Sequence, residues 1–380
     1  MKNRYLCTNT LPWGTRIYLI FMSNISYLRN IFYSAVLSFL LVACAPNEGY
    51  ISISGYAQGG TYTVKLNLDG PQGRVAVAPE TIKASVDSVL LAIDNSVSGY
   101  NRSSLLSRFN SGETIAPDLI FRELYDVSYK FFELTDGAFD VAAGPLYDAW
   151  GFGFKGNTFP TDPEVRQLRE NCGMDVLRGT VEEALGADGM LAPESLLKKE
   201  GASPVLNFNA IAQGYSADLV ARYLYSIGVK DMLVDIGGEI FCDGVNPDGK
   251  PWRLGIDRPV DGNNTPGADL QETFSTDGGP CGIVTSGNYR KFYVRDGKKY
   301  AHTVDPRTGY PVSHSLLSAT VIAADATSAD AIATYCMVIG TEDAKEFLET
   351  DPDYEGYLIY ACGDSLCCWR SPGRESVKGN

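Results

Sequence analysis

Residues 283–334 contain three segments that carry an unusual amount of chemistry: Ile283-Val-Thr-Ser-Gly-Asn-Tyr289, His302-Thr-Val-Asp305-Pro306-Arg-Thr-Gly309-Tyr-Pro311 and Ser328-Ala-Asp330-Ala-Ile-Ala-Thr334. The chain has only two histidines among 380 residues, and one of them stands three residues before an Asp-Pro turn. A rare titratable side chain, tight turns and a carboxylate-hydroxyl pair rarely gather where they have only a structural role. The pattern therefore predicts a functional site in this stretch.

The composition is that of an ordinary globular protein. Hydrophobic residues make up 44% and charged residues 21% of a chain that is long enough for one large domain or two modest ones. The formal net charge of −14 argues against a nucleic-acid partner, because binding to phosphates needs a basic surface. The nine cysteines include no Cys-x-x-Cys pair and fit no zinc pattern. Disulfides and buried thiols both stay open for them.

The first 43 residues have the pattern of an export signal. Arg29 precedes an apolar run at 31–43, which is too short for a membrane span, and Leu41-Val-Ala-Cys44 closes the run. This ending resembles a bacterial lipoprotein box, which implies that Cys44 becomes a lipidated first residue; an ordinary cleaved signal is the alternative. We expect translation to begin at Met22, because the signal then has a normal length. Lipidation would anchor the protein to a bacterial membrane, facing the periplasm.

Hydrophobic periodicity predicts interleaved helices and strands without a regular βαβ repeat, which indicates a mixed α/β (α+β) fold. We expect a lipidated tether at 44–56, one domain at 57–370, a surface loop at 261–279 and a flexible tail at 371–380. The predicted helices are 79–98, 119–134, 217–227 and 329–339. The predicted strands are 61–68, 232–236, 252–256, 289–294, 318–323 and 357–361.

Asp330 and Thr334 are four residues apart on a predicted helix and therefore share one face. A carboxylate and a hydroxyl are hard oxygen ligands that suit Mg²⁺, whose remaining ligands are waters and substrate phosphates. The alternative is an aspartate that stabilises the helix dipole beside a threonine that is merely packed. His302 is the candidate general base, and Asp305 is placed to orient it or to cap the following turn. A structural histidine is the alternative there.

Two further segments have the composition of ligand-binding loops. Asp136-Gly-Ala-Phe-Asp140 is followed by Trp150-Gly151-Phe152, so that flexible turns and aromatic faces for a planar ring lie close together. Asn207 and Gln213 stand where a strand leads into a helix, at a helix N-terminus that favours anions. A turn with core aromatics, and simple helix capping by Asn209 or its neighbours, are the alternatives.

Together these segments resemble the ApbE family of flavin transferases, which move FMN from FAD onto a threonine or serine of another protein. The resemblance runs from Gln58 to Phe347 and comprises five segments in the order that the family has. They are Gly59–Val64, Ser98–Tyr100 with Ser103–Asn110, Asp136–Gly153, Asn207–Asp218 with Gly237-Gly238, and Thr285–Thr334.

The resemblance implies a fold of interleaved helices and mixed sheets around a central FAD cleft. It places Mg²⁺ on the Ala210 carbonyl, Asp330 and Thr334, and it makes His302 the base that deprotonates the acceptor hydroxyl. The family often has Met at position 58, Asp at 207 and Lys or Glu at 213, where this chain has Gln58, Asn207 and Gln213. The residues expected to contact FAD are Gln58, Tyr100, Trp150, Gly151, Phe152, Asn207, Gln213 and Thr285.

Three readings of function follow from the same residues. By resemblance, the acceptor is a protein with a Ser/Thr-Gly-Ala-Thr type of motif, as in membrane redox-pump subunits. If water replaces the acceptor, the enzyme becomes an FAD pyrophosphatase that yields FMN and AMP. A non-catalytic flavin-binding lipoprotein, or a purely structural surface lipoprotein, is the reading from a different class.

Overall fold

The structure is a computed structural model that describes residues 49–70, 73–153, 159–260, 263, 267–288, 292–295, 298–301 and 303–372, with the backbone alone within 292–301. The predicted signal sequence, Met22 and the lipidation site Cys44 lie outside the described residues, and so does His302. The described part forms one compact unit that begins at Gly49.

An eight-stranded sheet forms the centre of this unit, in the order β1-β2-β5-β6-β9-β14-β15-β16, and each neighbouring pair is antiparallel. Its strands are β1 (Tyr50–Ala57), β2 (Gly60–Asn67), β5 (Met232–Ile236), β6 (Glu239–Asp243), β9 (Cys281–Gly287), β14 (Leu316–Ala323), β15 (Glu355–Cys362) and β16 (Ser365–Arg370). Four two-stranded pairs accompany it: β3 (Asp69–Gly70) with β4 (Gly73–Arg74), β7 (Arg253–Asp257) with β8 (Leu270–Ser275), β10 (Phe292–Arg295) with β11 (Lys298–Ala301), and β12 (Val304–Asp305) with β13 (Tyr310–Pro311).

The helices fall into two groups along the chain. Those that pack on the sheet are α2 (Pro79–Val97), α8 (Ala212–Ser226), α9 (Ala326–Ile339) and α10 (Thr341–Thr350). Those between α2 and α8 are α3 (Leu105–Asn110), α4 (Leu119–Leu134), α5 (Gly144–Ala149), α6 (Asp162–Asn171) and α7 (Pro193–Leu196), with the 3₁₀ turns η1 (Met174–Val176) and η2 (Glu182–Ala184). No helix of the described residues is both long enough and apolar enough for a membrane span.

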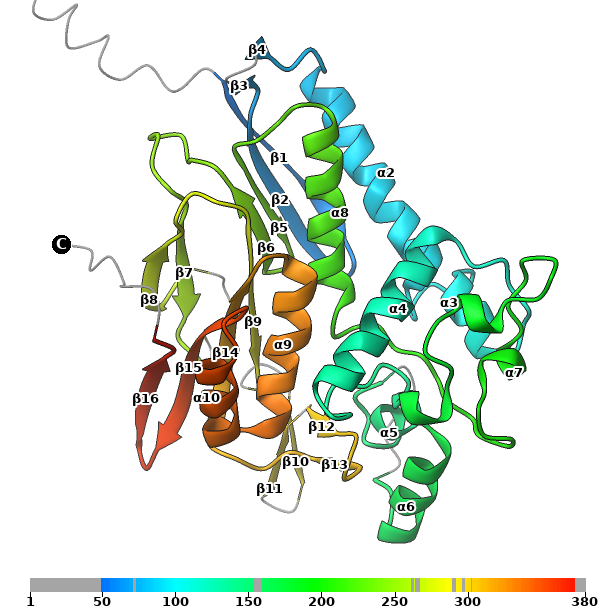
Figure 1. Cartoon of the computed structure of the whole chain (residues 1–380). Coiled ribbons are helices and arrows are strands. Elements are labelled where there is room, and N and C mark those ends of the chain that lie inside the picture. Colours follow the sequence, from blue (N-terminus) through cyan, green and yellow to red (C-terminus); the bar gives the residue numbers. More distant parts are fainter. Residues whose placement is uncertain are drawn as a thin grey trace, which may run out of the picture. The chain divides into compact units, whose positions relative to one another are not determined.

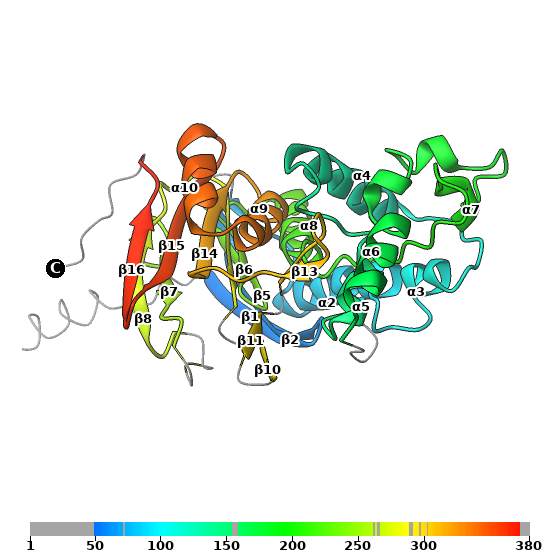
Figure 2. The same cartoon turned by 90° about the horizontal axis from the view of Figure 1, so that it is seen from below.

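The large sheet has different partners on its two faces (Figures 1 and 2). Helices α2, α8, α9 and α10 cover one face, and the β7–β8 hairpin lies against the other. The second face has a small core of its own, in which Trp252 and Phe274 of the hairpin region pack against Leu233 and Ile283 of the sheet. The arrangement confirms the predicted mixed α/β (α+β) class.

Period-four and period-three spacing of apolar residues explains why α2 forms and which side it buries. Pro79 occupies the first turn, where its missing N–H has no partner to lose. The apolar side chains then follow one stripe that faces the sheet and α8, and all are buried: Ile82, Val86, Leu90, Ile93 and Val97. Burial of one such side chain stabilises the fold by roughly 1.5–3 kcal/mol.

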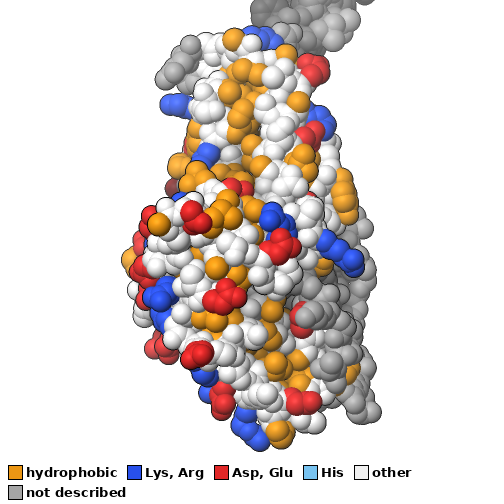
Figure 3. All heavy atoms as spheres, turned by 90° about the vertical axis from the view of Figure 1, so that its right-hand side faces the viewer, with side chains coloured by type: hydrophobic (Ala, Val, Ile, Leu, Met, Phe, Trp, Pro, Cys, Tyr) orange, Lys and Arg blue, Asp and Glu red, His pale blue; other side chains and the backbone are white. Residues whose placement is uncertain are grey.

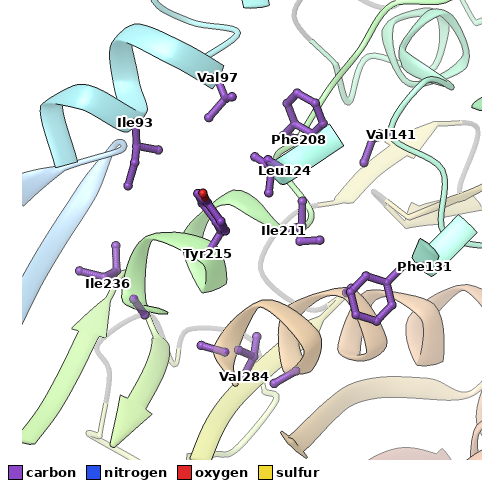
Figure 4. Packing of buried hydrophobic residues seen from close by; sticks show 14 of the residues in the cluster. Ile93, Val97, Leu124, Phe131, Val141, Phe208, Ile211, Tyr215, Ile236 and Val284 are labelled. Carbon is purple, nitrogen blue, oxygen red and sulfur yellow. The ribbon is translucent and has the colours of Figure 1, made fainter. Parts of the chain in front are cut away.

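The main core lies between α2, α4, α8, α9 and the sheet (Figure 4). Tyr215 of α8 stands in its middle, between Ile93 of α2 and Ile236 of β5. Its hydroxyl reaches the edge of the core and donates to Glu123 Oε2 at 2.7 Å, so the buried ring carries no unpaired polar group. This core fixes α8, the helix on which Gln213 lies.

Several predicted elements are confirmed. The second predicted helix and the strand at 232–236 have the predicted bounds in α4 and β5. Helix α8 begins at Ala212, five positions before the predicted start at 217. The prediction missed its first turn because Gln213, Gly214 and Ser216 give that turn no apolar periodicity. The predicted strand at 289–294 appears as β10 at Phe292–Arg295, while 289–291 lie outside the described residues.

Two boundary predictions are wrong. Residues 50–56, assigned to a tether, form most of β1, which pairs along its whole length with β2. Residues 270–275, assigned to a loop, form β8, because Leu254 and Phe274 pair across the β7–β8 hairpin and bury their side chains under the sheet. Both segments contain polar or small residues, serine and glycine in β1 and glutamine and glutamate in β8, and pairing with a neighbouring strand stabilises each of them.

The end of the described chain is held to the sheet. Ser371 donates its N–H to Gly356 O at 3.0 Å and accepts from Gly356 N at 2.9 Å, so the predicted tail begins later than residue 371. A Cys362–Cys367 disulfide closes the β15–β16 hairpin just before it. Four further cysteines are buried thiols, the alternative that the sequence left open, and Cys368 is an exposed one; the buried four are Cys172, Cys242, Cys281 and Cys336.

Helices α3, α6 and α7 lie on the side of the molecule that Figure 3 shows. Acidic and basic side chains are scattered there among polar and hydrophobic ones. Several of the charges on α3 and α4 are paired, as in the 2.9 Å contact between Arg108 Nε and Glu113 Oε2. Such exposed pairs contribute little stability, about 0–1 kcal/mol each.

Strand β9 and the start of α9 approach one another closely at Gly282. A Cβ atom at this position would lie 2.2 Å from Ala326 N and 2.2 Å from Asp325 O, both backbone atoms that cannot move aside alone. Gly282 is fully paired in the sheet, opposite Phe241 on β6 and Ala323 on β14. The absence of a side chain here therefore sets the distance between the sheet and α9.

We predict that Gly282→Ala lowers the free energy of unfolding by about 2–3 kcal/mol or more, because the new methyl group pushes α9 away from β9. Gly60→Ala is the matched control, since a Cβ there meets only Gly237 Cα at 3.8 Å. Urea unfolding followed by circular dichroism measures both. Equal stability of the two variants would contradict the close-approach argument.

Candidate functional site

A cavity of about 320 Å³ opens where the β5–β6 and β9 ends of the sheet meet the starts of α8 and the middle of α9. It gathers residues from every segment that carries the family resemblance after residue 136. Its lining includes Phe152, Asn207, Ala210, Gln213, Thr285, Asp330 and Thr334, all of which the sequence analysis selected. The remaining lining residues include Phe139, Asp140, Tyr147, Asn209, Glu239, Ser286, Thr303 and Met337.

A second cavity, of about 210 Å³, adjoins the first and shares Asn209 and Gln213 with it. Gln58 and Tyr100, the two earliest residues selected from the sequence, line this second cavity. Gln58 has a positive φ of 52° at the tip of the β1–β2 hairpin, and its Nε2 donates to Ser216 Oγ on α8. Tyr100 Oη accepts from Asn209 Nδ2 at 3.3 Å. The two cavities are therefore neighbours with a shared wall.

Trp150 and Gly151 do not line either cavity. Trp150 is buried, donates from Nε1 to Gly309 O at 2.8 Å, and its ring centroid lies 5.9 Å from that of Tyr310. The indole thus attaches the end of α5 to the β12–β13 turn. Gly151, at φ 82°, ends that helix and lets Phe152 turn into the first cavity.

Asp305 is engaged in its own turn. Its carboxylate accepts from Arg307 N at 2.9 Å and from Arg307 Nε at 3.0 Å, which is the capping role that the sequence left open beside a catalytic one. The predicted catalytic base, His302, lies outside the described residues, but its neighbours Thr303 and Val304 line the cavity. Thr303 Oγ1 donates to Asn288 Oδ1 at 2.7 Å, which fixes this segment beside the end of β9.

Helix α9 is held at its N-terminus by carboxylates. The N-cap Asp325 accepts from Ser328 N at 2.7 Å, and the buried Asp218 of α8 accepts from Ala326 N at 2.9 Å and Thr327 N at 2.8 Å. Backbone N–H groups of a first helical turn have no partner within the helix, so these carboxylates satisfy them. Asp325 thus caps the first turn of α9, and Asp330, for which a dipole-stabilising role was the alternative, lies one turn further on.

The Asp330 carboxylate faces the start of α8. Gly214 N donates to Asp330 Oδ2 at 3.1 Å, and a Cβ on Gly214 would lie 2.2 Å from Ala326 O. Glycine at 214 therefore permits α8 and α9 to come together closely enough for this hydrogen bond. Ala210, two residues before α8 begins, lines the same cavity as Asp330 and Thr334, so all three predicted metal-site residues meet.

The cavity is acidic. Burial raises the pKa of Asp330 to about 7; the Gly214 N–H counteracts this and the Asp218 carboxylate adds to it. Burial likewise raises the pKa of Asp140 to about 7, although Ala142 N and Met174 N donate to it. None of the described residues that line the cavity is a lysine or an arginine. Positive charge for an anionic ligand must therefore come from elsewhere.

The polar side chains at the strand-to-helix junction are partly used by the fold. Asn207 Oδ1 accepts from Asn209 N at 3.0 Å in a tight turn before α8. The N-cap of α8 is Ile211 and no side chain caps it, so the helix-capping alternative for this segment is wrong. Gln213 Nε2 reaches Ile236 O at 3.5 Å. Both side chains remain at the cavity wall, where their amides can contact a ligand.

Glu239 is the cavity residue that the sequence analysis missed. It is the first residue of β6 and follows the Gly237-Gly238 turn, whose residues have φ values of 74° and 115°. Burial raises its pKa well above the ordinary value, and the nearby Asp330 carboxylate raises it further. A lone glutamate at a strand start carries no signal, but its position directly after two glycines could have pointed to it.

No group of three or more His, Cys, Asp or Glu side chains in a metal-binding arrangement occurs among the residues that the structure describes. The described carboxylates that line the cavity are those of Asp140, Glu239 and Asp330. A protein site with so few carboxylates suits Mg²⁺, which keeps several waters and takes further oxygen ligands from substrate phosphates.

The similarity to known proteins covers the part of the chain that forms this site. The model of the ApbE family matches residues 59–358. The chain belongs to the ApbE family. Among proteins named FAD:protein FMN transferase, those of Escherichia coli K12 and Vibrio cholerae O1 are each 34% identical to it. The alignments cover 77% and 80% of this chain, and 80% and 85% of those proteins.

Solved ApbE structures have the same fold. The flavin transferase ApbE from Vibrio cholerae superimposes with a TM-score of 0.69 over 85% of this chain and 97% of that one. The apo form of the Pseudomonas stutzeri flavinyl transferase ApbE gives 0.71, over 85% and 95%. Both are 30% identical to this chain. The predicted family and fold are confirmed.

We predict that Asp330→Asn stabilises the metal-free protein at pH 8. In the wild type, a pKa raised from 3.8 to about 7 means that stability is lost as the pH rises through this interval. The loss reaches roughly 4 kcal/mol as an upper limit, and the neutral amide avoids it while keeping an oxygen for Gly214 N. Thermal unfolding in EDTA measures the effect.

The advantage of the variant should shrink at pH 5, where the folded wild type holds the proton. Asp343→Asn, at an exposed aspartate on α10, is the control and should change stability by less than about 0.5 kcal/mol at either pH. An Asp330→Asn protein that unfolds at a lower temperature than the wild type at pH 8 would contradict the buried-charge argument.

Proposed function

We propose that this protein is a Mg²⁺-dependent transferase that moves FMN from FAD onto a threonine or serine hydroxyl of an acceptor protein and releases AMP. The observation that carries the proposal is the meeting of Ala210, Asp330 and Thr334 in a cavity of a chain that belongs to the ApbE family. Relatives over most of its length are named FAD:protein FMN transferase.

The shape of the site supports a dinucleotide substrate. The larger cavity carries Phe152, Thr285 and the acidic group, whereas the smaller one carries Gln58 and Tyr100. An extended molecule that bridges both would pass Gln213, which lines each of them. The two halves of FAD, joined by a diphosphate, have this extended form, and the diphosphate then lies close to the shared wall.

The residues present fit a Mg²⁺ ion. Asp330, Thr334 and the Ala210 carbonyl would hold it, and all three offer the hard oxygen atoms that this ion prefers. When bound, Mg²⁺ neutralises charge on the diphosphate, the main requirement of phosphoryl-type transfer. An acidic cavity without lysine or arginine among its described lining residues would otherwise repel the substrate.

The chemistry assigned to the protein is modest. The acceptor hydroxyl oxygen attacks the phosphorus of the FMN half, a new O–P bond forms, and the bond from this phosphorus to the oxygen of AMP breaks. AMP leaves with the electron pair, and His302 takes the hydroxyl proton. Thr303 and Val304 at the cavity wall support this role, because they are the next residues along the chain.

For the acceptor we propose a protein with a Ser/Thr-Gly-Ala-Thr type of motif, of the kind found in membrane redox-pump subunits. A lipid on Cys44 would hold the enzyme at a bacterial membrane, facing the periplasm, which agrees with a membrane subunit as acceptor. The sequence Leu41-Val-Ala-Cys44 after an apolar run supports the anchor. Labelling of the cellular protein with a palmitate analogue tests it, and Cys44→Ala should remove the label.

We predict that Asp330→Ala lowers transfer at least a hundredfold, because the cation loses its carboxylate ligand among the three residues assigned to it. The assay mixes protein, FAD, Mg²⁺ and an acceptor fragment, and reads fluorescent covalent flavin on a gel beside AMP release. EDTA should abolish both signals in the wild type. Asp343→Ala is the surface control and should keep full activity.

The same assay separates the other readings. AMP release without a covalent adduct favours an FAD pyrophosphatase. Tight FAD binding without either product favours a flavin-binding lipoprotein, and absence of any flavin binding favours a structural protein. Full Mg²⁺-dependent transfer by Asp330→Ala would contradict the metal assignment while leaving the transferase activity in place.

We predict that His302→Ala abolishes transfer but leaves the dissociation constant for FAD within about threefold of the wild-type value, since a general base contributes to the reaction and little to ground-state binding. Quenching of flavin fluorescence measures the binding. If FAD binding is lost together with transfer, His302 has a structural role instead.

A further inference from the structure

The Oε2 atom of Glu239 is buried and has no hydrogen-bond partner among the described residues. Only three other side-chain atoms in the described part of the chain share this condition, Thr276 Oγ1, His314 Nδ1 and Ser318 Oγ. All three belong to neutral hydroxyl or imidazole groups, and none lines the cavity. A buried acidic oxygen without a partner is the costliest of these, because a carboxylate loses most on leaving water.

The turn before Glu239 brings it into the site. A Cβ on Gly237 would lie 2.2 Å from Gln213 Nε2 and 3.4 Å from Glu239 Oε2, so both side chains converge on this glycine. The Gln213 amide is directed to the Ile236 carbonyl rather than to the carboxylate. The close passage requires glycine at 237, whose φ of 74° is also unfavourable for other residues.

Nothing in the described cavity wall compensates the Glu239 charge. The described lining has no lysine or arginine, and it holds two further carboxylates, those of Asp330 and Asp140. Carboxylates that share a cavity repel one another unless a cation lies between them. The described residues of the wall therefore supply no positive charge that would balance these carboxylates.

We infer that Glu239 is a further cation-binding residue of this site, whose Oε2 completes the oxygen shell that Asp330, Thr334 and Ala210 begin. The inference rests on the proposed Mg²⁺ dependence and adds a ligand to it. A second carboxylate makes the site more negative, which favours a divalent over a monovalent cation and leaves charge for the diphosphate to share.

The test measures cation binding apart from activity. Mn²⁺ is titrated into EDTA-stripped, dialysed full-length protein with FAD present, and free Mn²⁺ is read by electron paramagnetic resonance. Glu239→Gln should weaken Mn²⁺ binding at least tenfold, whereas Glu349→Gln, at an exposed position on α10, should leave it unchanged. Glu239→Asp, which keeps a carboxylate, should restore part of the affinity.

A structural role for Glu239 would give a different result. Because Oε2 accepts no hydrogen bond, Glu239→Gln should not lower the melting temperature of the metal-free protein, and Mn²⁺ should raise its melting temperature less than that of the wild type. A metal-free melting temperature several degrees below the wild-type value would overturn the inference, and so would a wild-type Mn²⁺ affinity.

The outcomes separate the inference from the proposed function. If Asp330→Asn loses Mn²⁺ and Glu239→Gln keeps it, the proposed metal site stands and the role of Glu239 falls. If the wild-type protein itself binds no Mn²⁺ and transfers flavin in EDTA, the proposed metal dependence fails, and the inference fails with it for that separate reason.

Discussion

The position of helix α9 depends on how its first turn is satisfied inside the protein. A buried helix N-terminus exposes backbone N–H groups that need acceptors, and here Asp325 and Asp218 provide them. Two glycines, Gly214 and Gly282, then allow α8 and β9 to approach the helix on either side. Because the start of α9 is fixed in this way, the Asp330 carboxylate lies beside Gly214 N at the cavity wall.

This constraint also explains why the site could be found from sequence. The spacing of Asp330 and Thr334 requires only that the segment be a helix, and apolar periodicity established that. The sheet order could not be read from periodicity, because it is set by pairing between strands far apart in the sequence. The α8–α9 contact could not either, because it depends on Gly214, whose role appears only in three dimensions. The wrong boundaries at β1 and β8 have the same origin, because strand pairing there outweighs polar local sequence.

The residues selected from the sequence differ in whether neighbouring parts of the fold already use their polar atoms. Asp305 next to a turn was assigned to catalysis or capping, and its bonds to Arg307 show that the turn uses it. Trp150 was expected to contact FAD, and in the structure its indole donates a hydrogen bond to Gly309 O. Glu239 carried no motif, and what distinguishes it is a missing partner. Sequence patterns identify residues by type, whereas only packing shows which polar atoms remain for a ligand.

The charge of the cavity is therefore more informative than any single contact within it. A site built for an anion by the protein alone would place arginine or lysine at its wall, as phosphate sites commonly do. This wall instead buries Asp330 and Glu239 together, at a cost that the folded chain offsets elsewhere, in the core around Tyr215. Burial of like charges is tolerable where an ion of opposite charge binds with the substrate. Under the proposed function, the acidic wall would repel an anion that arrives alone and would admit one that arrives with a divalent cation.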